Sequence, residues 1–258
     1  MPRNARQTIG GTYYHIHNRT IEPAQVFKDS ADCWKLIELI NCAQERIPLD
    51  LLAVCIMPNH FHLIVRPLLS VDLGQWMQWL FTTHVRRWHS QHQSAGPIWQ
   101  GRFKAFPIAP DEHLLSVMRY VEANALRARL VKRAECWAWS SLNWRCSPRP
   151  PVALTPPPLP LPGNWTELVN AAQSPQELAA IRMCLGRQNP FGTLRPALPS
   201  ADHLLDSMSL HACESLLGEP PGASDVASGP ESHAQPGYLL LKRPELRRVP
   251  VPAKAESS

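Results

Sequence analysis

Two histidines separated by one residue stand out in the segment PNHFHLIV, residues 58 to 65. On a β-strand the side-chain period is two, so His60 and His62 lie on one face and the apolar residues that alternate with them lie on the other. Two imidazoles directed the same way from one strand can bind one metal ion. The same spacing also describes two ordinary histidines on a solvated sheet face, so the motif alone leaves both interpretations open.

A tyrosine lies on the polar stripe of a predicted helix in RYVEANALRA, residues 119 to 128. Polar side chains recur there at intervals of three and four and include Tyr120 and Asn124, while apolar side chains form the opposite stripe. We therefore expect Tyr120 to lie off the core face, with Asn124 one turn further on. A tyrosine hydroxyl has a pKa of about 10 and needs activation, or an activated target, to act as a nucleophile. The alternative is a half-buried packing tyrosine with its hydroxyl at the surface.

Cations and aromatic side chains alternate in GPIWQGRFKAFPI, residues 96 to 108. Cations hold phosphates and aromatic faces stack on bases, so this composition is typical of a groove that binds single-stranded nucleic acid. An amphipathic edge strand with solvated basic side chains would look the same. Basic side chains on the preceding helix and on the tyrosine's own helix extend the set. The candidate DNA-binding residues are Arg86, Arg87, Trp99, Arg102, Phe103, Lys104 and Arg127.

The hydrophobic periodicity predicts which elements position these residues. Strands are expected at 12–18, 49–57, 60–66 and 98–108, and helices at about 32–45, 72–92 and 112–130. The order β-α-β-β-α-β-α is typical of an α+β protein with a ferredoxin-like antiparallel sheet and helices on one face. This arrangement predicts that His60, His62, Tyr120 and Asn124 surround one small cavity.

A proline-rich stretch at 147–163 divides the chain, since it cannot continue a helix or a central strand. We interpret residues 1–146 as a catalytic domain, 147–163 as a semi-rigid extended linker and 164–192 as a short helical segment. Residues 193–258 are rich in Pro, Ser and Gly and lack periodicity, and we expect them to be disordered.

Composition limits the remaining possibilities. The 258-residue chain has a formal charge of +5, which is compatible with nucleic-acid binding but does not establish it. No apolar run is long enough for a membrane span or a secretory signal, so we expect a cytoplasmic protein. Seven cysteines without a Cys-x-x-Cys pair argue against a disulfide framework and against a zinc knuckle.

Four motifs together resemble one known family. MPNHFHLIV, WQGRFKAFPI, DEHLLSVMRYVEANALRA and WAWSSL follow one another in the order found in REP-associated tyrosine transposases, which are relatives of the small HUH transposases of insertion sequences. The resemblance covers residues 9 to about 192 and includes GGTYYHIHNR near the start and GNWTELVN and GRQNPFG after the proline-rich stretch. The chain departs from the family after PFG, where relatives continue into a Lys/Arg-rich end.

The resemblance implies a fold, a site and an activity. It implies that His60 and His62 are metal ligands, that Asn124 is the third protein ligand and that Tyr120 is the nucleophile. The expected enzyme is a Mg²⁺- or Mn²⁺-dependent endonuclease and strand transferase, which acts in DNA transposition and recombination through a 5′-phosphotyrosine intermediate. Its expected partner is single-stranded DNA or a REP-like palindromic hairpin, it binds no membrane, and it acts at the nucleoid as a monomer or homodimer.

Two other classes of protein are compatible with parts of the pattern. A catalytically silent protein that binds hairpin DNA and regulates or marks it would need neither Tyr120 nor the two histidines. A structural zinc-binding module would need a fourth Cys or His ligand, and none stands at a plausible spacing. We therefore expect the enzyme, with the silent hairpin-binding protein as the alternative.

Overall fold

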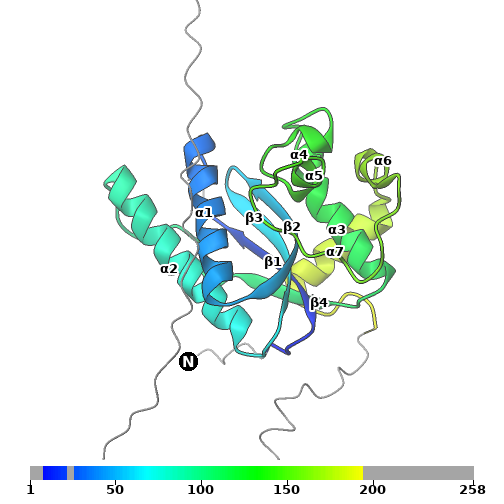
Figure 1. Cartoon of the computed structure of the whole chain (residues 1–258), viewed down its shortest axis with the longest axis horizontal. Coiled ribbons are helices and arrows are strands. Elements are labelled where there is room, and N and C mark those ends of the chain that lie inside the picture. Colours follow the sequence, from blue (N-terminus) through cyan, green and yellow to red (C-terminus); the bar gives the residue numbers. More distant parts are fainter. Residues whose placement is uncertain (1–7, 22–25, 194–258) are drawn as a thin grey trace, which may run out of the picture. The chain divides into compact units, whose positions relative to one another are not determined.

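A computed structural model describes residues 8–21 and 26–193 (Figure 1). Within these ranges, no helix is both long and apolar enough to cross a membrane. The elements follow the expected order up to Glu122, and short helices then complete the chain. They are β1 Tyr13–Arg19, α1 Ser30–Arg46, β2 Leu49–Met57, β3 His60–Pro67, α2 Asp72–His92, β4 Lys104–Ile108, α3 Glu112–Glu122, α4 Asn124–Arg127, a 3₁₀ turn η1 Ala134–Cys136, α5 Ser141–Arg145, α6 Trp165–Asn170 and α7 Pro175–Arg187.

The sheet has the strand order β2-β3-β1-β4, and every neighbouring pair is antiparallel. β2 and β3 form the expected hairpin, and β1 inserts between β3 and β4. This order, with helices linking β1 to β2 and β3 to β4, is the ferredoxin-like split arrangement. The α+β class, the antiparallel sheet and the β-α-β-β-α-β-α order predicted from the sequence are confirmed.

One face of the sheet is covered by α1 and α2, which pack side by side (Figure 1). The core on this side includes Leu36 and Ile40 from α1, Trp76 and Leu80 from α2 and Leu63 from β3, all at most 2% exposed. Asp29 caps α1 by accepting a hydrogen bond from the backbone of the first turn. The amphipathic periodicity of both helices is therefore satisfied by this one core.

The second face is also covered, which corrects the expectation of helices on one face only. α3 packs against β2 and β3, α4 and α5 pack against β2, and α7 packs against β4 (Figure 1). The reason is visible in β2, LDLLAVCIM, where eight of nine residues are buried. A strand buried on both faces has a nearly continuous apolar run, whereas a half-exposed strand alternates.

The strand predicted at 98–108 is shorter in the structure. Only Lys104–Ile108 forms β4, and the preceding residues approach β1 through an isolated bridge between Thr20 and Trp99. Gly101, with φ of +142°, interrupts the pairing in a conformation that favours glycine. Residues 99–103 therefore form a loop between α2 and the sheet.

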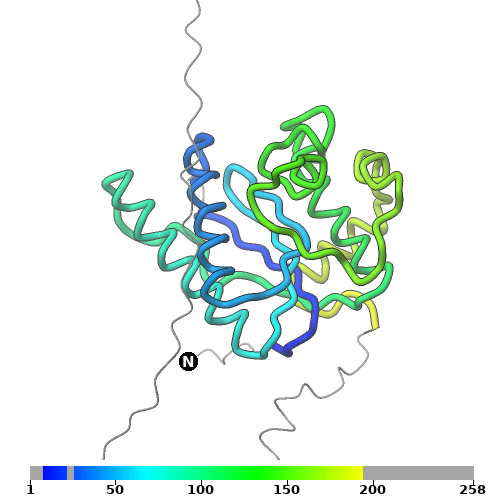
Figure 2. Tube along the Cα trace, viewed as in Figure 1, coloured from blue at the N-terminus to red at the C-terminus, as the bar shows by residue number. Residues whose placement is uncertain are grey.

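The proline-rich segment 147–163 forms no helix or strand, but it packs along the domain (Figure 2). Val152 is 2% exposed, the Thr155 amide donates to the Leu51 carbonyl at 2.8 Å, and Asn41 of α1 donates to the Pro151 carbonyl at 2.9 Å. These contacts cover the outer edge of β2 and lead the chain to α6 and α7. The expectation for the tail at 193–258 lies almost wholly outside the described residues.

Candidate active site and metal centre

His60 and His62 lie on the same face of β3, on the side that α3 covers. Their ring centroids are 5.1 Å apart. β2 lies beside them, with Cys55 opposite His62 and Met57 opposite His60 in the register. Because side chains of β3 alternate between the two faces of the sheet, both imidazoles lie in the narrow space between the sheet and α3.

The neighbouring strand β1 contributes two more histidines to this face. The antiparallel register places His17 opposite His62, and the ring centroids of these two residues are 4.6 Å apart. The ligand nitrogens of His17, His60 and His62 lie within 4.8 Å of one another, a geometry that fits one metal ion. His17 was not among the ligands predicted from the sequence. Its signal was the second His-x-His pattern, YHIH, on a predicted strand.

Two hydrogen bonds fix which nitrogens face the cluster. The Nδ1 atom of His60 lies 2.8 Å from Oδ1 of Asn59, and Nδ1 of His62 lies 2.8 Å from Nε2 of His15. Since the Asn59 oxygen only accepts, Nδ1 of His60 carries the proton and Nε2 keeps its lone pair. The same tautomer in His62 requires His15 to accept at Nε2. Partners behind a metal ligand orient the ring and select its tautomer in this way.

The histidine cluster is held in its neutral form. Burial lowers the pKa of His60 to about 4, with a further contribution from Arg19, and it lowers the pKa of His17 to about 3, with a further contribution from His60. Burial also lowers the pKa of His15 and His62 well below the usual value. Neutral imidazole is the form that binds metal ions, so these side chains are ready to coordinate at neutral pH.

Tyr120 lies near the end of α3 and faces the histidines. Its ring centroid is 5.9 Å from that of His62 and 6.1 Å from that of His15. The residue is 6% exposed, so the expectation that it lies off the core face is wrong in one respect. The tyrosine ring faces the histidines of the sheet instead of solvent, because α3 covers that face of the sheet.

Arg127 holds the tyrosine from the other side. Its guanidinium lies 4.1 Å from the centroid of the Tyr120 ring and donates to the Tyr120 carbonyl at 2.7 Å. The predicted helix at 112–130 is divided at Ala123 into α3 and α4, and this turn brings Arg127 back over the ring. Arg127 also donates to Oε1 of Gln173 at 3.3 Å, and its expected role in DNA binding remains a prediction.

Asn124, the third ligand implied by the resemblance, is the first residue of α4. It is 9% exposed, and its Nδ2 atom is buried without a hydrogen-bond partner among the described residues. A buried amide with an unsatisfied group is costly unless something else satisfies it. Its position one turn after Tyr120 keeps it a candidate ligand.

A buried carboxylate anchors the helix that carries Tyr120. Glu122 has no exposed surface and accepts hydrogen bonds from Ser141 at 2.6 Å and Trp165 at 2.7 Å. Arg145 forms an ion pair with the same carboxylate at 3.0 Å. The WAWSSL segment and α6 are thus attached to the end of α3, which explains why these distant motifs accompany the tyrosine.

The candidate DNA-binding residues fall into two groups. Arg102 and Lys104 are exposed, and Lys104 lies opposite His17 in the register of β1 and β4; Arg86 and Arg87 are exposed on α2. Trp99 is only 8% exposed, and its ring contacts those of Phe27, Phe61, Phe81 and His84. The structure therefore packs most of the Trp99 ring against other rings of the core, since a large aromatic side chain gains most from burial.

Comparisons with known proteins agree with this description. Residues 8–124 match the family described as "Transposase IS200 like". No curated protein matches the chain.

Among solved structures, one similar chain is a REP-associated tyrosine transposase bound to a REP hairpin, with 18% identity, a TM-score of 0.46 and coverage of 55% of this chain and 84% of that one. Another is a protein from Deinococcus radiodurans R1 assigned as a transposase, with 18% identity, a TM-score of 0.34 and coverage of 47% of this chain and 96% of that one. The matched segment begins just before β1 and ends at Asn124, so it contains the histidine strands and the tyrosine helix. Residues 8–124, somewhat less than half of the 258-residue chain, are thus similar to the IS200-like transposases.

Proposed function

We propose that this chain cleaves single-stranded DNA and transfers the cut strand through a covalent 5′-phosphotyrosine at Tyr120. The observation that carries the proposal is the arrangement of Tyr120 over a buried cluster of neutral histidines, with ring centroids 5.9 Å apart between Tyr120 and His62. A packing tyrosine would need no such neighbours. The match of residues 8–124 to the IS200-like transposases supports DNA as the substrate.

The donor set fits a divalent metal ion. His60 and His62 would hold it through Nε2, with His17 as a further imidazole and Asn124 as the amide ligand that the resemblance implies. Imidazoles prefer transition ions over Mg²⁺, so of the two ions expected from the sequence we favour Mn²⁺. A bound divalent ion polarises a phosphoryl oxygen and stabilises the charge that develops during displacement.

The reaction conserves the energy of the cleaved ester. The Tyr120 hydroxyl oxygen attacks the scissile phosphorus, an O–P bond forms, and the bond from phosphorus to the 3′ oxygen breaks. The hydroxyl proton leaves to solvent, and the departing 3′ oxygen takes up a proton to become a 3′-OH. Attack by another 3′-OH on the phosphotyrosine reverses these changes and joins the new strand, so no nucleotide triphosphate is needed.

The remaining side chains position the reactants. Arg127 restrains the tyrosine through its ring and its carbonyl, and Asn59 and His15 orient the ligand imidazoles. Lys104, Arg102, Arg86 and Arg87 are exposed cations that would hold phosphates, and half-buried Phe103 lies beside them. An orientation held before the substrate arrives removes part of the entropic barrier to in-line attack.

We further propose that the DNA is a REP-like palindromic hairpin with a single-stranded flank. This step rests on the motifs that resemble the REP-associated tyrosine transposases, and one similar solved structure is such a transposase bound to a REP hairpin. A DNA substrate would place the activity in the cytoplasm, at the nucleoid. One tyrosine per chain can hold one DNA end at a time, so a full exchange requires sequential steps in a monomer or a second tyrosine from a homodimer.

The test is a covalent-adduct assay. The protein is incubated with labelled hairpins that carry random single-stranded flanks in the presence of Mn²⁺, and adducts are resolved on a denaturing gel. We expect an adduct from the unchanged protein and none from Tyr120→Phe, which removes one hydroxyl and almost no packing area.

Tyr13→Phe is the matched control, since Tyr13 is a buried tyrosine of the same sheet face, 8% exposed. It should retain the adduct. Normal hairpin binding without any adduct would instead support the catalytically silent DNA-binding protein, and an adduct from Tyr120→Phe would place the nucleophile elsewhere, with Tyr13 and Tyr14 the next candidates.

A further inference from the structure

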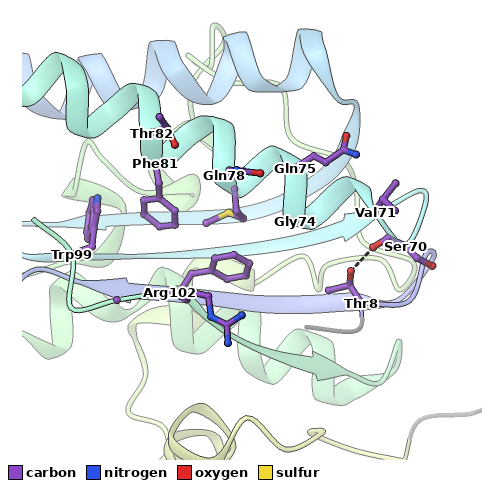
Figure 3. Close-up of a pocket in the computed structure, with 13 residues that line it drawn as sticks. Thr8, Ser70, Val71, Gly74, Gln75, Gln78, Phe81, Thr82, Trp99 and Arg102 are labelled. Atoms are coloured by element: carbon purple, nitrogen blue, oxygen red, sulfur yellow. Dashed lines mark hydrogen bonds between the residues drawn. The ribbon is translucent and has the colours of Figure 1, made fainter. Parts of the chain in front are cut away.

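A cavity of about 720 Å³ lies between α2 and the loop 99–103, away from the histidine cluster (Figure 3). Its volume falls within the range of about 300–1,000 Å³ that is usual for small-molecule sites. None of the four clustered histidines lines it. Its main walls are Gly74, Gln78 and Phe81 from α2, and Trp99, Arg102 and Phe103 from the loop.

The inner wall of the cavity is aromatic. The rings of Phe81 and Phe103 are nearly parallel, with centroids 6.3 Å apart and an interplanar angle of 24°. Phe81 projects from α2 toward the strands, where Phe61 and Trp99 pack against it at 5.7 Å and 5.3 Å (Figure 3). Gln78 is exposed on the same helix and offers an amide at the rim. A planar ring with polar groups on its edge would complement the Phe81 and Phe103 rings and the Gln78 amide.

A second cleft adjoins the cavity through Arg102. It has a volume of about 290 Å³ and is lined by His17, Asn18, Arg19, Gln100, Arg102 and Lys104. Three of these described lining residues are cationic and none is a carboxylate, so the cleft complements a phosphate. Arg102 lines both spaces, and its guanidinium points away from α2 (Figure 3).

The basic cleft shares one residue with the aromatic cavity and one with the histidine cluster. His17 lines the basic cleft and also belongs to the three-histidine group. A DNA strand that leaves the histidine cluster would therefore pass the cations of the basic cleft before it reaches the aromatic cavity, which lies on the α2 face of the sheet. Cations along the backbone next to an aromatic platform are the general means by which proteins hold single strands.

We propose that this cavity binds one nucleobase of the single-stranded DNA, from a nucleotide near the scissile phosphate whose own phosphate lies in the Arg19–Arg102–Lys104 cleft. The proposal rests on the proposed function, since it assumes a single-stranded substrate. It adds a site for a base to a centre that otherwise contacts phosphates. The base stacks on the Phe81 and Phe103 wall, and the Gln78 amide contacts its edge.

The test compares two probes of equal length and charge. One is a fluorescent pool of random single-stranded DNA of about 20 nucleotides, and the other is an abasic strand of the same length. The unchanged protein should bind the base-bearing pool at least about fivefold more tightly. Gly74 lines the cavity, and a Cβ at this position meets nothing within 4 Å, so Gly74→Trp should place an indole in the cavity without a backbone clash. This variant should lose that preference and retain its affinity for the abasic strand.

Gly186→Trp is the matched control, since Gly186 lies on α7 outside the cavity and its Cβ would also meet nothing within 4 Å. It should bind both probes as the unchanged protein does. A Gly74→Trp variant that keeps the full preference for bases would overturn the proposal, and so would an unchanged protein that binds both probes equally. Binding of neither probe would instead overturn the proposed function itself.

Discussion

Glu122 has no exposed surface and lies two residues beyond the proposed nucleophile, so its ion pair with Arg145 is a sensitive point of the fold. We predict that Arg145→Met destabilises the protein strongly. Removing one partner of a buried ion pair costs about 3–5 kcal/mol, because the remaining charge is left uncompensated. Ser141 and Trp165 still donate to the carboxylate, so we expect about 3 kcal/mol, the lower end of that range.

The assay is urea unfolding followed by tryptophan fluorescence, with thermal unfolding as a second measurement. For a domain of this size, a loss of about 3 kcal/mol corresponds to a Tm decrease of about 6–12 °C. Arg133→Met is the matched control, since the Arg133 side chain is 57% exposed in its pair with Glu135. Solvent screens an exposed ion pair, so this variant should change the free energy of unfolding little.

The double variant Glu122→Gln with Arg145→Met tests the cause. A neutral amide removes the buried charge. Its oxygen can accept from Trp165 and its NH2 group can donate to the Ser141 hydroxyl, so the double variant should be more stable than Arg145→Met alone. Equal effects of Arg145→Met and Arg133→Met would refute the reasoning. So would a double variant less stable than the single one, because the loss would then come from packing and not from the charge.

Three further predictions concern the metal, the DNA and pH. His17→Ala should weaken Mn²⁺ binding, measured by calorimetry, at least about tenfold; if only Asn124→Ala weakens it, the amide and not the third imidazole is the ligand. Arg102→Ala with Lys104→Ala should weaken single-strand binding for all sequences and flatten the log–log salt dependence by about one to two units, whereas an unchanged slope would exclude phosphate contacts there. The metal-free protein should lose stability as pH falls below about 6.5. Histidines of the unfolded chain bind protons from that pH downward, whereas His17 and His60 of the folded protein, with pKa of about 3 and about 4, stay neutral. The free energy of unfolding continues to fall until the pH reaches the pKa of each folded-state histidine, by up to about 1.4 kcal/mol per pH unit for each one. Equal free energies of unfolding in urea at about pH 7 and about pH 5 would contradict this prediction.

Local pattern was sufficient for the elements that carry the site. The apolar run of β2, the turn at Pro58 and the amphipathic period of α2 predicted boundaries that agree with the structure to within a residue. The strand period of two also placed His60 and His62 on one face, because side-chain alternation is a property of the backbone and needs no partner.

Other features depend on what packs against each element, and only the tertiary structure decided them. Tyrosine and tryptophan have both apolar and polar parts, so the sequence alone does not decide whether Tyr120 and Trp99 are buried. Tyr120 is buried because α3 covers the second face of the sheet, and Trp99 is buried because the loop 99–103 directs its indole into the core. The break at Ala123 likewise follows from contacts of α4 with β2 and from Arg127 returning over the tyrosine. Helix propensity is similar for a continuous helix and for one broken at Ala123, so the side chains that each arrangement buries decide which one forms.

The sequence by itself determined that a His-x-His strand, a tyrosine helix and a basic aromatic segment occur in one α+β chain. Only the tertiary structure decided that His15 and His17 join this group, because the register between β1 and β3 brings together residues more than forty positions apart. It also decided that the histidines are neutral, since burial lowers their pKa. The physical reason is common to both: side-chain direction is set within a strand, whereas neighbours and burial are set by the chain that folds against it.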